Sequence, residues 1–193
     1  MNSAPTLRVS DKMVMMERDK LARTIYDRTH LTGEFVLRSG AVSNEYFDKY
    51  RFESDPALLR EIATALAPLV PSDVDGLAGL ELGGVPIATM LSQVTGLPAY
   101  FVRKEAKTYG TCQLAEGGDI DGLRLAIVED VVSSGGQVVM SCQDLRARGA
   151  TVEHAVIVID RRAGDGPDAL AENGIAVHRL FTMAELTDAG TRP

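Results

Sequence analysis

The sequence predicts an α/β protein with a mostly parallel central sheet flanked by helices. Its 193 residues suit one compact domain, and 45% of them are hydrophobic, which is ordinary for a globular chain with one core. From residue 76 onward, short and almost wholly apolar segments alternate with helical patterns. Strands of that kind are typical of parallel sheets covered by helices on both faces. We therefore expect a single domain over residues 1–193.

The first third of the chain is expected to contribute helices and a hairpin. Residues 1–10 show no apolar period, which predicts a mobile arm. An apolar stripe predicts a helix over residues 11–28. Two short strand-like pieces flank Ser39-Gly40-Ala41 and predict a β-hairpin or a paired extended segment. One proline begins and another ends a helix over residues 56–71.

The remaining elements follow in order along the chain. Strands are expected at residues 76–82, 99–102, 123–128, 151–159 and 175–181. Helices are expected at residues 86–95, 136–148, 167–172 and 183–189. Residues 104–122 form a long irregular stretch that contains lysines and several glycines. Since loops of this length inside an α/β domain are usually functional lids or disordered, we expect a long flexible loop that carries positive charge.

Composition excludes several classes of protein. No apolar run reaches the roughly 18 residues that a membrane span needs, and the N-terminus lacks a signal-peptide pattern, so we expect a cytoplasmic protein that does not bind membranes. The net charge of -7 argues against generic binding to nucleic acid. Cys112, Cys142 and the three histidines lack metal-ligand spacing, so we expect no metal site built by protein side chains.

The strongest functional signal lies between Leu125 and Gln137. An apolar strand runs directly into the carboxylates of Glu129 and Asp130, then into Ser133-Ser134-Gly135-Gly136, which opens a helix. In an open parallel sheet, ligands bind beyond the carboxyl ends of the strands. Glycine amides, serine hydroxyls and a helix N-terminus all bind phosphate. The carboxylates repel an anion and need sugar hydroxyls, a divalent cation or a developing positive charge. The segment therefore predicts a site for a phosphorylated sugar.

Two other segments carry residues suited to anions. Gly83-Gly84 follows a strand and precedes a helix, so its amides are free to contact an oxyanion, although a simple tight turn is the alternative. Arg103, Lys104 and Lys107 bring three cations to the end of one strand and into the long loop. That concentration of charge suits a ligand with several phosphate groups, while a solvated face is the alternative.

These motifs resemble those of the type I phosphoribosyltransferases. The acidic pair followed by Ser-Ser-Gly-Gly is similar to their signature for phosphoribosyl pyrophosphate. Further segments are similar to the orotate phosphoribosyltransferases within that family: Phe35–Gly40 with Tyr46–Asp48, Glu81–Ala88, and Phe101–Lys107. The likeness spans residues 21–162, with the motifs in order. It implies the type I phosphoribosyltransferase fold, with a small hood from the N-terminal segment.

The resemblance implies a role for each matched residue. For phosphoribosyl pyrophosphate it implies Gly83, Gly84, Arg103, Lys104, Lys107, Glu129, Asp130, Val131, Val132, Ser133, Ser134, Gly135, Gly136 and Gln137. For orotate it implies Arg38, Tyr46, Phe47, Ser133 and Arg161. For catalysis it implies Arg103, Lys104, Lys107 and Asp130. An arginine and an aromatic face suit the carboxylate and flat ring of orotate. For Tyr46 and Phe47, core packing is the alternative.

Four positions depart from the family pattern. Tyr109 stands where many relatives have a histidine, and it cannot become cationic. Gly83 stands where some relatives have a lysine, so one pyrophosphate contact would be missing. Arg38 replaces a common lysine and keeps its charge. Ser133 replaces a frequent threonine and keeps its hydroxyl.

The reaction that the resemblance implies is a Mg²⁺-dependent glycosyl transfer. The 5-phosphoribosyl group would pass from phosphoribosyl pyrophosphate to orotate, giving orotidine 5′-monophosphate and pyrophosphate in pyrimidine biosynthesis. Mg²⁺ is expected to be held mainly by substrate oxygens and water. In the family, the residues matched by Arg103 and Lys107 reach the neighbouring subunit's site, which implies a homodimer with shared active sites.

Two alternatives stay open at this point. One is a phosphoribosyltransferase for another base, such as a purine. The other is a non-catalytic regulator that keeps the fold and senses phosphoribosyl pyrophosphate. The pair Arg38 and Arg161 favours a carboxylated base, and the presence of Lys104, Lys107, Glu129 and Asp130 favours catalysis.

Overall fold

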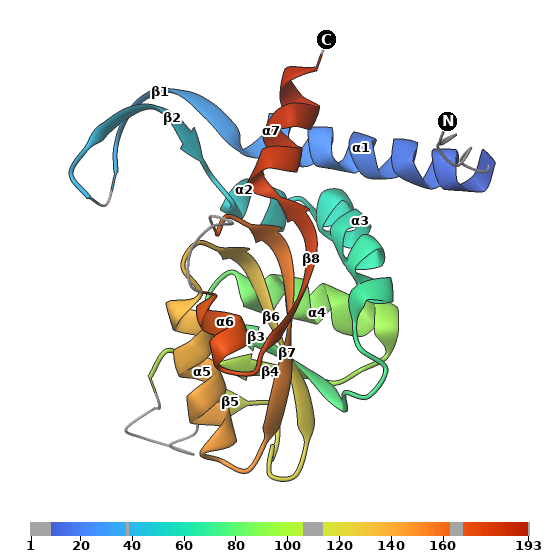
Figure 1. Ribbon diagram of the computed structural model, residues 1–193, viewed down its shortest axis with the longest axis vertical. Coiled ribbons are helices and arrows are strands. Elements are labelled where there is room, and N and C mark those ends of the chain that lie inside the picture. The colour runs from blue at the N-terminus through green and yellow to red at the C-terminus, as the bar shows by residue number, and fades with distance from the viewer. Residues whose placement is uncertain (1–8, 38, 106–113, 163–167, 193) are drawn as a thin grey trace, which may run out of the picture. The chain divides into compact units, whose positions relative to one another are not determined.

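The chain forms two units, one of which contains both ends of the sequence. The computed structural model describes residues 9–37, 39–105, 114–162 and 168–192. One unit comprises Met1–Asp48 with Ala184–Pro193, and the other comprises Lys49–Met183 (Figure 1). Each unit is described by itself below. The expectation of a single domain over the whole chain stays a prediction.

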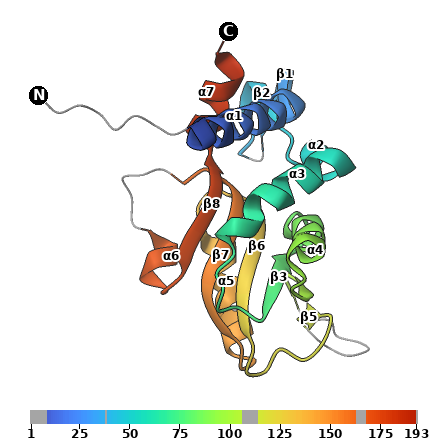
Figure 2. The same ribbon diagram turned by 90° about the vertical axis from the view of Figure 1, so that its right-hand side faces the viewer.

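The first unit consists of two helices and a β-hairpin. Helix α1 (Val9–Thr29) leads into β1 (His30–Val36), which pairs antiparallel with β2 (Val42–Phe47). Helix α7 (Met183–Thr191) crosses α1 (Figure 2). The Arg18 guanidinium lies 3.0 Å from the Glu185 carboxylate across this crossing. The predicted helix and hairpin are confirmed, although α1 begins two residues earlier than expected. Most of the expected mobile arm, residues 1–8, lies outside the described residues.

The second unit is built on a six-stranded sheet with the order β5-β4-β3-β6-β7-β8. Its strands are β3 (Gly76–Leu80), β4 (Ala99–Val102), β5 (Ala115–Glu116), β6 (Arg124–Val132), β7 (Thr151–Asp160) and β8 (Ala176–Thr182). All neighbouring pairs are parallel except β5, which runs antiparallel beside β4 at the edge. The predicted α/β class with a mostly parallel sheet is therefore confirmed.

Helices cover both faces of this sheet. Helices α3 (Pro56–Leu66) and α4 (Gly84–Thr95) lie on one face, and α5 (Gly136–Arg146) and α6 (Ala169–Glu172) on the other (Figures 1 and 2). The short helices α2 (Tyr50–Glu53) and η1 (Ala67–Leu69) flank α3. Asp55 caps α3 by accepting hydrogen bonds from two amides of its first turn. In the described ranges, no helix is long and apolar enough to cross a membrane.

The central strand β6 is buried on both faces, which explains its apolar sequence. Leu125 and Ile127 point into the core that α5 completes with Cys142 and Leu145. Ala126, between them on the strand, is also inaccessible to water. Since successive side chains of a strand point to opposite faces, both layers of helices must pack closely against β6.

The ends of several elements differ from the sequence-based expectation. Strand β6 continues to Val132 instead of ending at Val128, because β7 remains paired with it as far as Asp160. The acidic pair therefore lies inside the strand and not after it. Strand β3 ends at Leu80, two residues early, and β5 occupies part of the expected irregular stretch 104–122. Residues 106–113 of that stretch lie outside the described residues.

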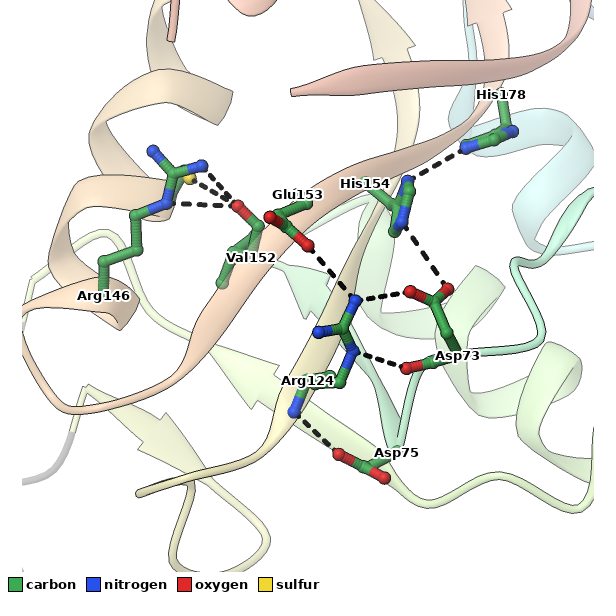
Figure 3. A network of polar contacts seen from close by, with 9 residues as sticks. Asp73, Asp75, Arg124, Arg146, Val152, Glu153, His154 and His178 are labelled. Atoms are coloured by element: carbon green, nitrogen blue, oxygen red, sulfur yellow. Dashed lines mark hydrogen bonds and ion pairs between the residues drawn. The ribbon is translucent and has the colours of Figure 1, made fainter. Parts of the chain in front are cut away.

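A polar network ties the amino-terminal halves of the strands together (Figure 3). The Arg124 guanidinium, at the start of β6, binds the carboxylate of Asp73 and lies 3.2 Å from that of Glu153. Asp73 also faces Nε2 of His154 at 3.6 Å. Nδ1 of His154 lies 3.2 Å from Nε2 of His178 on β8. Burial, together with the neighbouring His154, lowers the pKa of His178.

The lowered pKa of His178 predicts a pH-dependent stability. As the pH falls through about 6.5, the unfolded chain takes up a proton that the folded protein binds only at lower pH, so the free energy of unfolding should decrease. A His178→Gln variant should lose this part of the slope. Urea unfolding of both proteins at a series of pH values between about 7 and 5.5 measures it. Identical slopes would contradict the assignment to His178.

Candidate active site

Most of the residues suited to anions meet at one edge of the sheet. Strands β3, β4, β6 and β7 are parallel, so their carboxyl ends lie together. Directly after these ends come Gly83-Gly84, Arg103-Lys104, Ser133–Gly136 and Arg161, respectively. In open α/β sheets this edge is the usual place for a ligand. The structure therefore brings together four segments that the sequence singled out separately.

The turn between β6 and α5 is open for a phosphate. Ser133 and Ser134 are exposed, and Gly135 has a φ of 81°, a left-handed conformation that glycine adopts without strain. Within the described parts of the chain, the amides of these three residues donate no hydrogen bond. They precede the N-terminus of α5, whose dipole also favours an anion. This turn can hold a phosphate monoester.

The acidic pair is not a free surface feature, since Asp130 is completely buried. The Lys49 ammonium lies 2.6 Å from Oδ2 of Asp130. Its other oxygen, Oδ1, accepts a hydrogen bond of 2.6 Å from the Val131 amide. Glu53, on α2, is also buried, and it is one of the groups that lower the pKa of Asp130. Asp130 is thus held from the segment that begins α2 as well as from its own strand.

The two carboxyls of the pair titrate in opposite directions. Burial, followed by the neighbouring charge of Asp130, raises the pKa of Glu129 well above its usual range. Burial acts on Asp130 in the same sense, but hydrogen bonds from Glu53 and Lys49 outweigh it and lower its pKa. Asp130 is therefore the ionised member at neutral pH, and Glu129 holds a proton that it can donate.

Glycines at the start of α4 allow this carboxylate to lie where it does. A Cβ at Gly83 would lie 1.9 Å from Oδ2 of Asp130, and one at Gly84 would lie 2.2 Å from the carbonyl oxygen of Val128. The backbone contact excludes a side chain at residue 84, and a side chain at residue 83 would have to displace the Asp130 carboxylate. The glycine at 83, where some relatives carry lysine, therefore has a physical reason in this chain. It also places Asp130 at the positive end of the α4 dipole.

Of the two cations described directly after β4, Arg103 is held in an ion pair and Lys104 has an exposed side chain. The Arg103 guanidinium forms an ion pair of 3.3 Å with Glu116 on β5. The Lys104 amide donates a hydrogen bond of 2.6 Å to Oε1 of Glu81, which joins the start of the long loop to the turn before α4. The Lys104 side chain is exposed. Lys107 and Tyr109 lie outside the described residues.

The residues expected to bind a carboxylated base are only partly placed. Arg161, after β7, is exposed, and its amide donates to the carbonyl oxygen of Val132 at 2.8 Å. Its neighbour Arg162 is occupied by ion pairs with Asp160 and Asp168. Arg38 lies outside the described residues.

Tyr46 and Phe47 lie on β2, in the other unit, so their part in this site stays a prediction. The Tyr46 ring is 45% exposed and lies 5.5 Å from the Phe35 ring, whereas Phe47 is half-buried. Neighbours on a strand point to opposite sides, so the two aromatic rings cannot face the same ligand in the same way.

The sequence-based reasoning missed Lys49 and Glu53. Two carboxylates next to an apolar strand indicate buried charge, and buried charge needs a counter-ion. That signal predicts a cation near Asp130. It does not say which one, because the contact joins residues 81 positions apart in a segment with no pattern of its own.

A metal ion held by protein side chains alone has no site in the described part of the chain. No group of three or more histidine, cysteine, aspartate or glutamate residues there could hold one. The two carboxyls at the sheet edge include one bound to Lys49 and one that is protonated. This donor set fits an ion that arrives on a substrate and keeps its waters.

Comparison with known proteins identifies the family. Residues 51–177 match the family described as "Phosphoribosyl transferase domain". The chain is 52% identical over 170 residues to the orotate phosphoribosyltransferase of Nocardioides sp., an alignment that covers 88% of this chain and 94% of that protein.

Solved structures agree with the sequence relatives. Orotate phosphoribosyltransferase of Mycobacterium tuberculosis in complex with inorganic phosphate superposes with a TM-score of 0.78 at 25% identity, covering 89% of this chain and 99% of that one. The same enzyme in complex with phosphoribosyl pyrophosphate gives a TM-score of 0.74 at 25% identity, with the same coverage of both chains.

The fold, the site and these matches together define the class: the chain belongs to the phosphoribosyltransferase family. Among the members of that family, it belongs with the orotate phosphoribosyltransferases. The resemblance that the sequence motifs suggested is thereby confirmed.

A methyl group at position 83 tests the close approach of the turn to the acidic pair. Gly83→Ala should displace the Asp130 carboxylate, since the added Cβ would otherwise overlap its Oδ2. A misplacement of this size at a catalytic site can reduce kcat/KM by about 10²-fold. Steady-state assays of the wild type and the variant, with thermal unfolding as a check on folding, measure it. A folded Gly83→Ala protein with unchanged activity would contradict this account of the site.

Proposed function

We propose that the chain transfers the 5-phosphoribosyl group from phosphoribosyl pyrophosphate to orotate, giving orotidine 5′-monophosphate and pyrophosphate. One observation carries the proposal: an open phosphate-binding turn and a proton-sharing acidic pair lie side by side on β6 and the residues after it. A phosphorylated ribose presents a phosphate and two hydroxyls, and therefore suits both. The reaction serves pyrimidine biosynthesis, and a location in the cytoplasm stays a prediction.

Three groups of residues each bind one part of phosphoribosyl pyrophosphate. The amides and hydroxyls of Ser133–Gly136 bind the 5-phosphate. The ribose hydroxyls belong to the acidic pair: Glu129, which is partly exposed, contacts them directly, and the buried Asp130 acts on the sugar through its charge. The amides of Gly83 and Gly84, with the ammonium groups of Lys104 and Lys107, bind the diphosphate.

The chemistry needs little covalent participation by the protein. Departure of pyrophosphate leaves positive charge on the anomeric carbon and the ring oxygen, as in other glycosyl transfers. Lys104 stabilises the negative charge that develops on the leaving group, and the nearby carboxylate of Asp130 favours the cationic sugar. Arg161 orients orotate through its carboxylate, so that a ring nitrogen lies in line with the anomeric carbon. Closure of the long loop would exclude water.

We include Mg²⁺ as the cofactor, entering with the diphosphate. The donor set described above supports an ion held mainly by substrate oxygens and water. When bound, the ion neutralises part of the charge on the departing pyrophosphate. The protein's own part is to bind the 5-phosphate at one end of the substrate and the diphosphate at the other.

A homodimer with shared active sites belongs to the same proposal. In that arrangement Arg103 and Lys107 serve the neighbouring subunit. Arg103 is paired with Glu116 of its own chain here, so its service to a neighbour requires that this pair open. This ion pair is partly buried, and ion pairs at protein surfaces contribute only about 0–1 kcal/mol, so its opening costs little.

The direct test is consumption of orotate, followed by its ultraviolet absorbance, with phosphoribosyl pyrophosphate and Mg²⁺. We expect turnover that stops when a chelator removes Mg²⁺. A panel of purine and pyrimidine bases serves as the specificity control. Preferred use of a purine would establish the other-base alternative. Binding of phosphoribosyl pyrophosphate without turnover of any base would establish the regulator.

Arg161 should contribute mainly to binding the base. Arg161→Ala should raise the KM for orotate by about 10-fold or more, since a charge-assisted hydrogen bond contributes about 1.5–3 kcal/mol. The KM for phosphoribosyl pyrophosphate should change much less. Arg148→Ala, which removes an exposed arginine at the end of α5, is the matched control. Equal effects of the two variants on the orotate KM would remove Arg161 from the base site.

A further inference from the structure

We propose that Lys49 is a positioning residue of this phosphoribosyl site. Its ammonium holds the Asp130 carboxylate in place against the Gly83-Gly84 turn, and in this way fixes the acidic pair beside which the ribose binds. The inference rests on the proposed function and adds to it a residue that no sequence motif indicated.

The shortest contact of the Lys49 ammonium is with Asp130. Lys49 immediately precedes α2, and its Nζ lies 2.6 Å from Oδ2 of Asp130. The side chain is 31% exposed, whereas that of Asp130 is fully buried. The lysine therefore spans from water to a carboxylate that water does not reach. Its aliphatic stem makes this possible without burying the whole side chain.

The same carboxylate oxygen touches the turn that begins α4. A Cβ at Gly83 would fall 1.9 Å from Oδ2, the atom that Lys49 binds. The Asp130 carboxylate thus lies between the Lys49 ammonium and the Gly83-Gly84 turn, and it touches both. Loss of the ammonium would free the carboxylate to move against the turn that we assign to the diphosphate, so binding of both the ribose and the diphosphate would weaken.

Charge balance explains why a cation is needed at this point. Asp130 faces Glu53 from α2, Glu129 from β6, the amide of Val131, and Lys49. These groups are three carboxyls and one ammonium in a largely buried space. Without the ammonium, no cation among them would offset the carboxylates, and the buried group would hold an additional proton. The acidic pair would then carry no ionised carboxylate beside the sugar.

The test compares Lys49→Gln, which removes the charge, with Lys49→Arg, which keeps it. We expect Lys49→Gln to lower kcat/KM for phosphoribosyl pyrophosphate by about 10²-fold. The acid limb of its pH profile should move up by about 1–3 pH units, because Asp130 loses the cation that lowers its pKa. Lys49→Arg should restore most of the activity and the wild-type acid limb. Lys20→Met, on α1, is the control for loss of a lysine.

A purely structural role for Lys49 would change the stability of the protein or the fraction of active enzyme without moving the pH profile, and that result overturns the inference. A folded Lys49→Gln variant with wild-type kinetics overturns it as well.

If Lys49→Gln does not fold, the double variant Lys49→Gln/Asp130→Asn replaces the buried ion pair by a neutral one. Its kcat/KM should equal that of Asp130→Asn alone, and a further loss would refute action through Asp130.

Failure of the proposed function would look different. In that case the wild type itself would not consume orotate, whereas failure of this inference leaves wild-type turnover intact. Binding of ribose 5-phosphate, measured by calorimetry, supplies a readout that does not depend on turnover. Lys49→Gln should weaken this binding, and Lys49→Arg should preserve it.

Discussion

The site depends on one close contact, in which a buried carboxylate lies between strand β6 and the first turn of α4. Asp130 can occupy this place only because residue 83 has no side chain and Lys49 supplies a counter-charge. Burying an unpaired carboxylate would be strongly unfavourable, and here an ammonium, a backbone amide and the positive end of a helix share the task of stabilising it. Burial, followed by the charge of Asp130, raises the pKa of the neighbouring Glu129. A protonated and an ionised carboxyl group thereby come to lie next to the turn between β6 and α5.

The two ends of the parallel sheet serve different purposes. Polar groups at the carboxyl ends leave amides and cations open to a ligand. At the other end, Asp73, Arg124, Glu153, His154 and His178 satisfy one another and join four segments of the sheet. The same kinds of side chain are therefore structural or functional according to whether their partners are already within the chain. The charge of a side chain does not separate the two kinds of residue, whereas the presence or absence of a bonding partner within the chain does.

Much of the fold followed from local patterns. The order of strands and helices from residue 76 onward was predicted from apolar segments and their breaks, as was the α3 start at Pro56. The turn between β6 and α5 could also be predicted, because its residues are contiguous. Strand ends could not: β6 gains its last residues, with both carboxylates, from pairing with β7. Lys49 was missed since its role arises from a tertiary contact with Asp130.

The division of the chain also sets an order of events during synthesis. Residues 49–183 are continuous and contain the whole sheet with its strand-end turns, so a ribosome has delivered all of them before the last segment appears. Helix α1 precedes this segment and helix α7 follows it, so the ion pair between Arg18 and Glu185 can form only after residues 49–183 have been synthesised. The first unit is therefore completed later than the sheet that its two parts enclose in the sequence.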